Sequence, residues 1–290
     1  MNRRQFVYVA AVWPVWAASA KPMRLGLILP VGKDPESAIR TVQELGLPTC
    51  QVGVDSFEPD LASRLRGVLE RYGVEATSAV AGGPGPEVYD FYQGPLTIGL
   101  VPRATRETRI ARVKQTSDFA KKCGIPAVQT HCGFIPENPN DPVYKEAVDA
   151  VRQVAAYCRK NGQSFRCETG QETPITLLRT IQDVGLDNVG VNFDPANLIM
   201  YGKADPVEAL DVLGPLVLGV HAKDGLYPVD PKNLGREVPI GQGQVNFPRF
   251  IWRLKEIGYG GPLTIEREVS GPKQLEDVRA AKAYLEKLAG

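Results

Sequence analysis

The stretch from residue 164 to residue 225 decides the fold, because it holds three short apolar segments that each end in a polar residue. They are SFRCETG (164–170) with Glu168, VGVNFDPAN (189–197) with Asp194, and VLGVHAKDG (217–225) with His221. The helix-like segments TPITLLRTIQDVG and DPVEALDVLG lie between them. A repeat of strand, polar residue and helix is typical of a (β/α)8 barrel, whose active site lies at the C-terminal ends of the strands.

A fourth copy of this pattern, PLTIERE, carries Glu266 and Glu268. Burying a charge costs free energy unless the group is paired or bound to a metal, so repeated acids at the ends of apolar strands need a reason. Carboxylates together with an imidazole suit Mn, Mg, Co or Zn and not a thiolate site. The alternative is that each polar group is only a helix cap or a surface residue. Side chains alternate along a strand, so the pattern does not separate Glu266 from Glu268.

The rest of the chain completes a ring of eight strand–helix units without a domain linker. We therefore predict an α/β fold, a single-domain (β/α)8 TIM barrel over residues 21–290. The other expected strands are 23–29, 49–55, 75–83 and 127–134. The other expected helices are 34–47, 60–74, 104–124, 141–162, 247–260 and 271–288.

Residues 84–102 form a long Gly- and Pro-rich segment that holds Tyr89, Phe91 and Tyr92. Long loops after barrel strands often serve function, so we interpret this one as a lid or a substrate-specificity loop. The alternative is a surface excursion that is packed by its own aromatic side chains.

The composition indicates a folded globular protein. The 290 residues are 43% hydrophobic and 23% charged, with a net charge of +1. This balance lacks the basic excess of a nucleic-acid-binding protein, so we expect no nucleic-acid partner. The five cysteines form no Cys-x-x-Cys pair, which argues against a disulfide framework and a zinc–thiolate site.

The first 20 residues, MNRRQFVYVAAVWPVWAASA, are interpreted as a signal peptide. Arg3 and Arg4 precede an uncharged run and a small-residue cleavage pattern that ends at Ala20, and the paired arginines resemble a twin-arginine signal. We predict export, to the periplasm. The alternatives are a first helix of the fold and an uncleaved anchor. The apolar run is shorter than the ~20 residues of a comfortable span, so we expect no stable membrane insertion after cleavage.

The ordered segments CETGQE, NFDPAN, VHAKD, IGQGQVNF and TIERE resemble the xylose isomerase-like barrel superfamily over residues 23–288, and most closely its sugar-phosphate isomerase/epimerase branch. This resemblance implies one divalent metal (Mn, Mg, Co or Zn) that is held by Glu168, Asp194, His221 and Glu266. It favours Glu266 over Glu268 as the ligand. Gln244 stands where the family usually has a glutamate, which weakens an acid role at that position.

The chemistry follows from that ligand set. A bound metal polarises a carbonyl and stabilises an enediolate, while Glu168 and Glu266 remove and return the proton as catalytic groups. We therefore expect a metal-dependent sugar isomerase or epimerase. Export favours a free or oxidised carbohydrate over a phosphorylated one. The alternatives are a lyase or dehydratase on keto-sugars or inososes with the same site, and a non-catalytic metal-containing carbohydrate-binding barrel.

Further polar residues are expected around this site. His131, Lys223 and Arg236 are predicted to contact substrate, and Lys223 has the alternative of pairing with Asp224 or Glu266. We expect a second group of residues to contact the metal ligands and orient them without binding the metal: Glu172, Asn192 and Glu268. The DNA-repair endonuclease branch of the superfamily is excluded because its trinuclear zinc site needs more histidines than the two of this chain. A homo-oligomer remains open.

Overall fold

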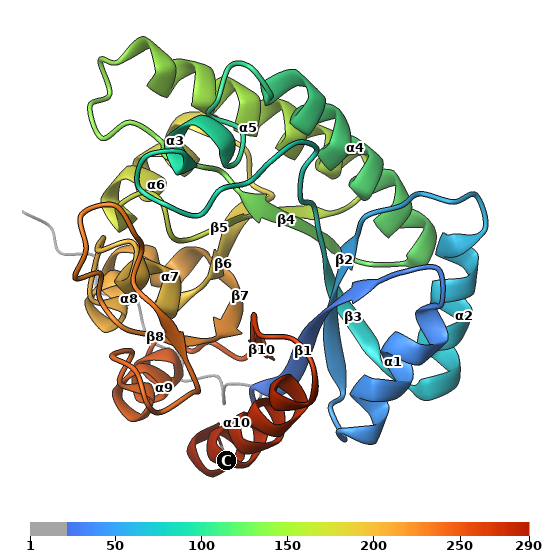
Figure 1. Ribbon diagram of the computed structural model, residues 1–290. Coiled ribbons are helices and arrows are strands. Elements are labelled where there is room, and N and C mark those ends of the chain that lie inside the picture. Colours follow the sequence, from blue (N-terminus) through green and yellow to red (C-terminus); the bar gives the residue numbers. More distant parts are fainter. Residues whose placement is uncertain (1–21, 290) are drawn as a thin grey trace, which may run out of the picture.

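The structure, a computed structural model, describes residues 22–289. Eight parallel strands close into a barrel in the order β1-β10-β7-β6-β5-β4-β3-β2 (Figure 1). The strands are β1 (Arg24–Val31), β2 (Thr49–Val54), β3 (Glu75–Val80), β4 (Ala127–His131), β5 (Ser164–Glu168), β6 (Val189–Phe193), β7 (Val217–Ala222) and β10 (Pro262–Ile265). The predicted single (β/α)8 TIM barrel is confirmed.

Helices surround this ring of strands in Figure 1. Apolar residues from both layers form the buried core between them. The helices are α1 (Pro35–Glu44), α2 (Leu61–Tyr72), α3 (Gly94–Thr97), α4 (Arg106–Cys123), α5 (Pro142–Lys160), α6 (Pro174–Val184), α7 (Pro195–Met200), α8 (Pro206–Leu213), α9 (Phe247–Glu256) and α10 (Pro272–Ala289). A short 3-10 turn (Gly214–Leu216) and a two-stranded antiparallel sheet, β8 (Asp224–Gly225) with β9 (Glu237–Val238), complete the described chain.

Several helices begin with the same local chemistry, a capping side chain followed by proline. In α1 the carboxylate of Asp34 accepts hydrogen bonds from the backbone N–H groups of Glu36 and Ser37, and Pro35 occupies the first turn. The cap satisfies donors that the helix leaves open, and proline has no N–H to lose there. The same pairing starts α5, α6, α7 and α8. In α7 the capping residue is Asp194 itself, so this helix starts directly after β6.

The structure corrects some of the predicted boundaries. β3 ends at Val80 and β4 at His131, several residues before the predicted ends. After β3 the chain runs into Gly82 and Gly83, and after β4 it turns at Gly133, whose φ is 97°. Such turns cannot continue a parallel ladder. The short elements α3, α7, β8 and β9 were not predicted, because two to six residues are too few to show a periodic pattern.

The predicted signal peptide lies outside the described residues. Of the helices within residues 22–289, none is both long enough and apolar enough to span a bilayer. The five cysteines are all buried and unpaired.

Candidate metal centre and active site

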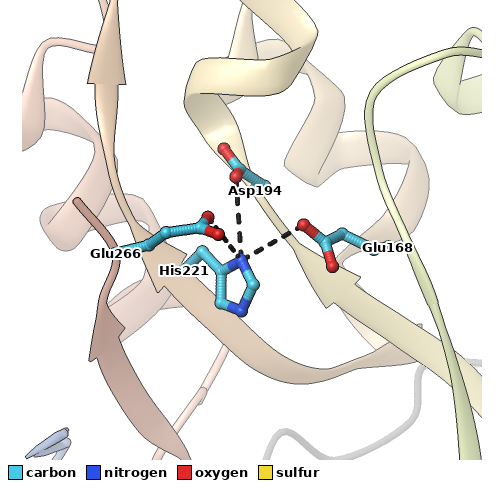
Figure 2. Close-up of side chains that lie close together, drawn as sticks. All are labelled: Glu168, Asp194, His221 and Glu266. Carbon is cyan, nitrogen blue, oxygen red and sulfur yellow. Dashed lines mark ion pairs between the residues drawn. The ribbon is translucent and has the colours of Figure 1, made fainter. Parts of the chain in front are cut away.

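Four polar side chains meet at the C-terminal ends of four neighbouring strands. Glu168 is the last residue of β5, Asp194 follows β6, His221 lies in β7 and Glu266 follows β10. One possible ligand atom from each lies within 4.8 Å of the others. Figure 2 shows the four side chains pointing toward one another. These are the four residues for which a metal-binding role was predicted.

The Nδ1 atom of His221 lies at the centre of this group. It is 3.0 Å from Oε2 of Glu266, 3.3 Å from Oε1 of Glu168 and 3.7 Å from Oδ2 of Asp194 (Figure 2). Among the described residues, Nδ1 of His221, Oδ2 of Asp194 and Oε2 of Glu266 are buried without a hydrogen-bond partner.

Three carboxylates this close repel one another unless a cation lies between them. Three oxygen donors and one imidazole nitrogen form the ligand set that hard and borderline divalent metals accept. The buried atoms without a partner on His221, Asp194 and Glu266 are the atoms that such a metal would contact. The residues present therefore fit a divalent metal ion.

Asp194 uses its two carboxylate oxygens for different purposes. Oδ1 accepts a hydrogen bond from the backbone N–H of Asn197, 2.9 Å away, and so caps α7. The backbone N–H of Asp194 donates to the Thr169 hydroxyl at 2.8 Å, which fixes the start of the helix. Oδ2 is left facing His221. Helix capping and a role as a metal ligand therefore do not exclude each other at this residue.

The ring nitrogen of His221 that faces away from the carboxylates contacts Gln51, a residue for which the sequence predicted no role. This nitrogen, Nε2, lies 2.7 Å from Oε1 of Gln51 on β2, and Gln129 on β4 donates to the same oxygen at 2.9 Å. Gln51 in turn donates from Nε2 to Oδ1 of Asn192 at 3.3 Å. Nε2 of His221 also lies 3.2 Å from the amide nitrogen of Gln129. The contact with Oε1 of Gln51 is shorter, and because this oxygen can only accept, it places the proton on Nε2 of His221. Its Nδ1 lone pair then points toward the carboxylates.

Charge interactions within the cluster shift the pKa values in opposite directions. Burial alone would lower the pKa of His221, but Glu266 and Glu168 outweigh it and raise the pKa well above its usual value. Burial opposes ionisation of Glu266, but Lys223 and His221 hold its pKa well below the usual range. Without a metal, the cluster thus favours a proton on His221. A metal ion that takes this site must displace that proton.

Lys223 is a buried cation beside the cluster. Its Nζ lies 2.7 Å from Glu268, 3.3 Å from Glu266 and 3.7 Å from Asp194. The predicted alternative of a pair with Glu266 matches this geometry. The alternative of a pair with Asp224 is wrong. The described ion pairs of Lys223 do not include Asp224, whose carboxylate accepts hydrogen bonds from backbone N–H groups instead. Glu268 is 57% exposed and lies outside the four-residue cluster.

Two other predicted residues adjoin the cluster. His131, at the end of β4, places Nε2 3.5 Å from Oε1 of Glu168, and Nδ1 lies 3.2 Å from Nε2 of Gln171. Asn192 is buried on β6 and accepts from Gln51. It thus supports the ligands through Gln51 and His221, by a connection that the sequence pattern does not contain.

Two predicted residues are not brought into contact with the cluster. Glu172 is buried, but within the described chain neither of its carboxylate oxygens has a hydrogen-bond partner, so it supports no ligand by a hydrogen bond. Burial raises the pKa of Glu172 to about 8. Arg236 is exposed beside β9, and no described ion pair joins its side chain to the cluster.

The fold and the site geometry agree with a family comparison. The family model described as xylose isomerase-like TIM barrel matches residues 39–288. The chain belongs to this family. The expected resemblance is confirmed by that match, which covers most of the chain.

Relatives of this family member include a solved structure and curated proteins. A xylose isomerase domain protein from Planctomyces limnophilus is 36% identical, with a TM-score of 0.86 over 92% of this chain and 97% of that chain. L-ribulose-5-phosphate 3-epimerase UlaE of Salmonella paratyphi B is 25% identical over 85% of this chain and 88% of that protein. An uncharacterised protein of Methanocaldococcus jannaschii is 28% identical over 192 residues, which span 62% of its length. The relatives of this chain thus include a sugar epimerase.

In this family member Asp224 organises the loop after β7. Its carboxylate accepts hydrogen bonds from the backbone N–H groups of Gly225, Gly241, Gly243 and Val245, at 2.9 to 3.2 Å. A Cβ on Gly243 would lie 2.1 Å from Oδ1 of Asp224, so the close approach requires glycine there. Sequence reasoning missed this role. The glycines of GQGQV were the available signal.

Proposed function

We propose that the protein is a divalent-metal-dependent isomerase or epimerase that moves a proton on a free or oxidised sugar. The observation that carries this proposal is the buried Nδ1 of His221, which has no hydrogen-bond partner and lies within 3.0 to 3.7 Å of three carboxylates from neighbouring strands. The sugar epimerase among the curated relatives supports the same reaction class.

Glu168, Asp194, His221 and Glu266 would hold the metal. When bound, it supplies Lewis-acid polarisation of a sugar carbonyl and stabilisation of the enediolate. The chain's own contribution is the placement of proton-transferring groups. Glu168 comes from β5 and Glu266 follows β10, with β6 and β7 between these strands in the barrel. In Figure 2 the two carboxylates lie on opposite sides of His221.

Two carboxylates on opposite sides can act on opposite faces of one sugar carbon. We infer that one removes the proton and the other returns it, which gives epimerisation. Return of the proton to the neighbouring carbon gives isomerisation instead. Loss of a β-hydroxyl from the same intermediate gives dehydration, the lyase alternative. The same residues serve all three outcomes, so product analysis has to distinguish them.

Lys223 and His131 are the proposed substrate contacts. Burial alone would lower the pKa of Lys223, but Glu266, Asp194 and Glu268 raise it well above the usual value, so the side chain stays cationic. A fixed cation beside Glu266 favours developing negative charge on a sugar oxygen. His131 lies beside Glu168 and has a ring nitrogen within reach of the same space.

The substrate class follows from the proposed export. If residues 1–20 direct the protein to the periplasm, its substrates are carbohydrates that occur there, which favours free and oxidised sugars over phosphorylated ones. This remains a proposal from the sequence.

The test is solvent deuterium exchange by the metal-loaded mature protein. Free ketoses, aldoses and 3-keto sugars are incubated in heavy water, and NMR follows the signal of each C–H next to a carbonyl. We expect exchange with wild type and its loss in Asp194→Asn. Sugar binding without exchange into any sugar would support the non-catalytic binding barrel and contradict the proposal.

A further inference from the structure

Exposed apolar side chains gather on two loops that follow β3 and β7. Tyr89 is 51% exposed and Tyr92 60% exposed on the loop after β3, and Val229 is fully exposed on the loop after β7. Val88, Leu96 and Tyr227 on the same two loops are also exposed. Exposed apolar residues usually occur singly, and a cluster of them marks a binding surface.

The two loops are joined to each other. The backbone N–H of Phe91 donates to the carbonyl of Lys232 at 3.1 Å, and Asp90 forms an antiparallel bridge with Asn233. Both loops follow the C-terminal ends of barrel strands, which is the side of the metal cluster. In Figure 1 the blue-green chain after β3 runs past β4 and β5 to α3. The joined loops thus form one structure at the barrel mouth.

The loop after β3 is anchored on both sides of Tyr89. The buried guanidinium of Arg109 donates to the carbonyl of Pro86 at 3.2 Å and to the carboxylate of Glu87 at 3.1 Å. On the other side, Asp90 forms the bridge to Asn233, and its carboxylate also accepts from the backbone N–H of Tyr92 at 2.8 Å within the loop. Anchoring of this kind lowers the entropy that a loop loses when it binds a ligand. The alternative interpretation of this segment, an excursion packed by its own aromatic side chains, does not fit the exposed Tyr89 and Tyr92.

Tyr89 connects this surface to the metal cluster. Its ring lies edge-on to the ring of His131, with 6.2 Å between the centroids. His131 in turn lies 3.5 Å from Glu168. Tyr89 is therefore one side chain further from the proposed reacting carbon than His131.

We propose that Tyr89 is the aromatic wall of a second subsite, which binds the ring attached to the reacting sugar in a glycoside. This proposal rests on the proposed function and narrows its substrate class to glycosides, in particular those whose attached group is a second sugar. The apolar C–H face of a sugar ring packs against an aromatic ring, and an anchored, half-exposed tyrosine offers such a face without first being uncovered. A monosaccharide at the metal would leave this surface unused.

The test compares the binding of matched ligands by saturation-transfer NMR on the Mg²⁺-loaded protein. The probes are glucose, galactose and mannose, their methyl glycosides, and the disaccharides cellobiose, lactose and maltose. We expect at least one disaccharide to bind about tenfold more tightly than its monosaccharide. Tyr89→Ala should remove this preference, and Tyr89→Phe, which keeps the ring, should retain it. Trp252→Ala, which removes an exposed aromatic residue on α9, is the control and should change nothing.

Three results would overturn the proposal. Equal binding of monosaccharides and disaccharides by wild type would refute the subsite while leaving the proposed function intact. The subsite would also be refuted if Tyr89→Ala left sugar binding unchanged and altered only self-association, measured by sedimentation. The exposed surface would then be a contact between two copies of the chain. Absence of any sugar binding to the metal-loaded wild type would refute the proposed function and the subsite together.

Discussion

Nε2 of His221 lies 2.7 Å from Oε1 of Gln51, although the two residues are 170 positions apart in the sequence. The contact crosses the barrel from β7 to β2 and directs the other ring nitrogen, Nδ1, toward Glu168, Asp194 and Glu266. A histidine that binds a metal commonly donates its second N–H to an oxygen, and this partner fixes the ring and its tautomer. Gln51 occupies that position here.

Replacing Gln51 with methionine should weaken metal binding about 10- to 100-fold, the usual cost of losing such a partner. Methionine keeps the length of the side chain but accepts no comparable hydrogen bond from Nε2. Calorimetric titration with Mn²⁺ measures the change. Gln163→Met is the control, because Gln163 is a buried amide bonded to Ser117 and not to the cluster. The control should lose stability but keep its metal affinity. Equal affinities of wild type and Gln51→Met would contradict the role of Gln51.

Asp224→Asn should loosen the loop after β7. The carboxylate accepts from four backbone N–H groups, whereas an amide has one oxygen and turns an NH2 group toward some of these donors. We expect a loss of about 2 kcal/mol or more in the free energy of unfolding. Hydrogen exchange should become faster across residues 239–246.

Asp230→Asn is the matched control for this change. Asp230 is exposed and accepts from the backbone N–H groups of Lys232 and Asn233 in the preceding part of the same loop. Its replacement should alter stability much less. If both variants changed stability and exchange alike, Asp224 would have no special part in holding the loop.

Glu172 should make the protein less stable as the pH rises. Burial raises its pKa to about 8 in the folded state, against 4.5 for an ordinary glutamate. Between these values the folded state holds a proton that the unfolded state has lost, so stability falls with increasing pH. Each pKa unit corresponds to about 1.4 kcal/mol. Glu172→Gln removes the titration and should be a few kcal/mol more stable than wild type at pH 8.

Urea unfolding at pH 5 and pH 8 tests this expectation. At pH 5 Glu172 is already neutral in the folded protein, so wild type and Glu172→Gln should differ little. Glu44→Gln, at an exposed position of α1, should not alter the pH dependence. A Glu172→Gln protein with the same loss of stability between the two pH values as wild type would show that another group causes it.

Much of the fold could be predicted because its signals are local. Asp34 followed by Pro35 marks a helix start, and three apolar segments with polar ends are enough to indicate barrel strands. Asp194 and His221 are visible in the same way, since each follows or ends a short apolar run. The repeated order of strand and helix, counted eight times along the chain, predicted that the strands close into a barrel.

Other features depend on partners that are distant in the sequence. Glu266 and Glu268 have the same strand parity, so alternation could not separate them. In the structure the backbone N–H of Glu266 still bonds to the carbonyl of Ala222 in the barrel, whereas Glu268 lies beyond it and is half exposed. The partners of Gln51 and Asp224 are fixed only when the barrel closes and its loops fold back. No local pattern contains them.

The most direct test of the metal site is the metal content of the purified protein by mass spectrometry, for wild type, Glu266→Gln and Glu268→Gln. The two variants make the same chemical change two residues apart. We expect about one divalent metal per chain in wild type and Glu268→Gln, and a large loss in Glu266→Gln. Wild type that binds no divalent metal, even when Mn²⁺, Mg²⁺, Co²⁺ or Zn²⁺ is supplied, would show that the four residues do not form a metal site. An equal metal content in the two variants would contradict the role of Glu266 as a ligand.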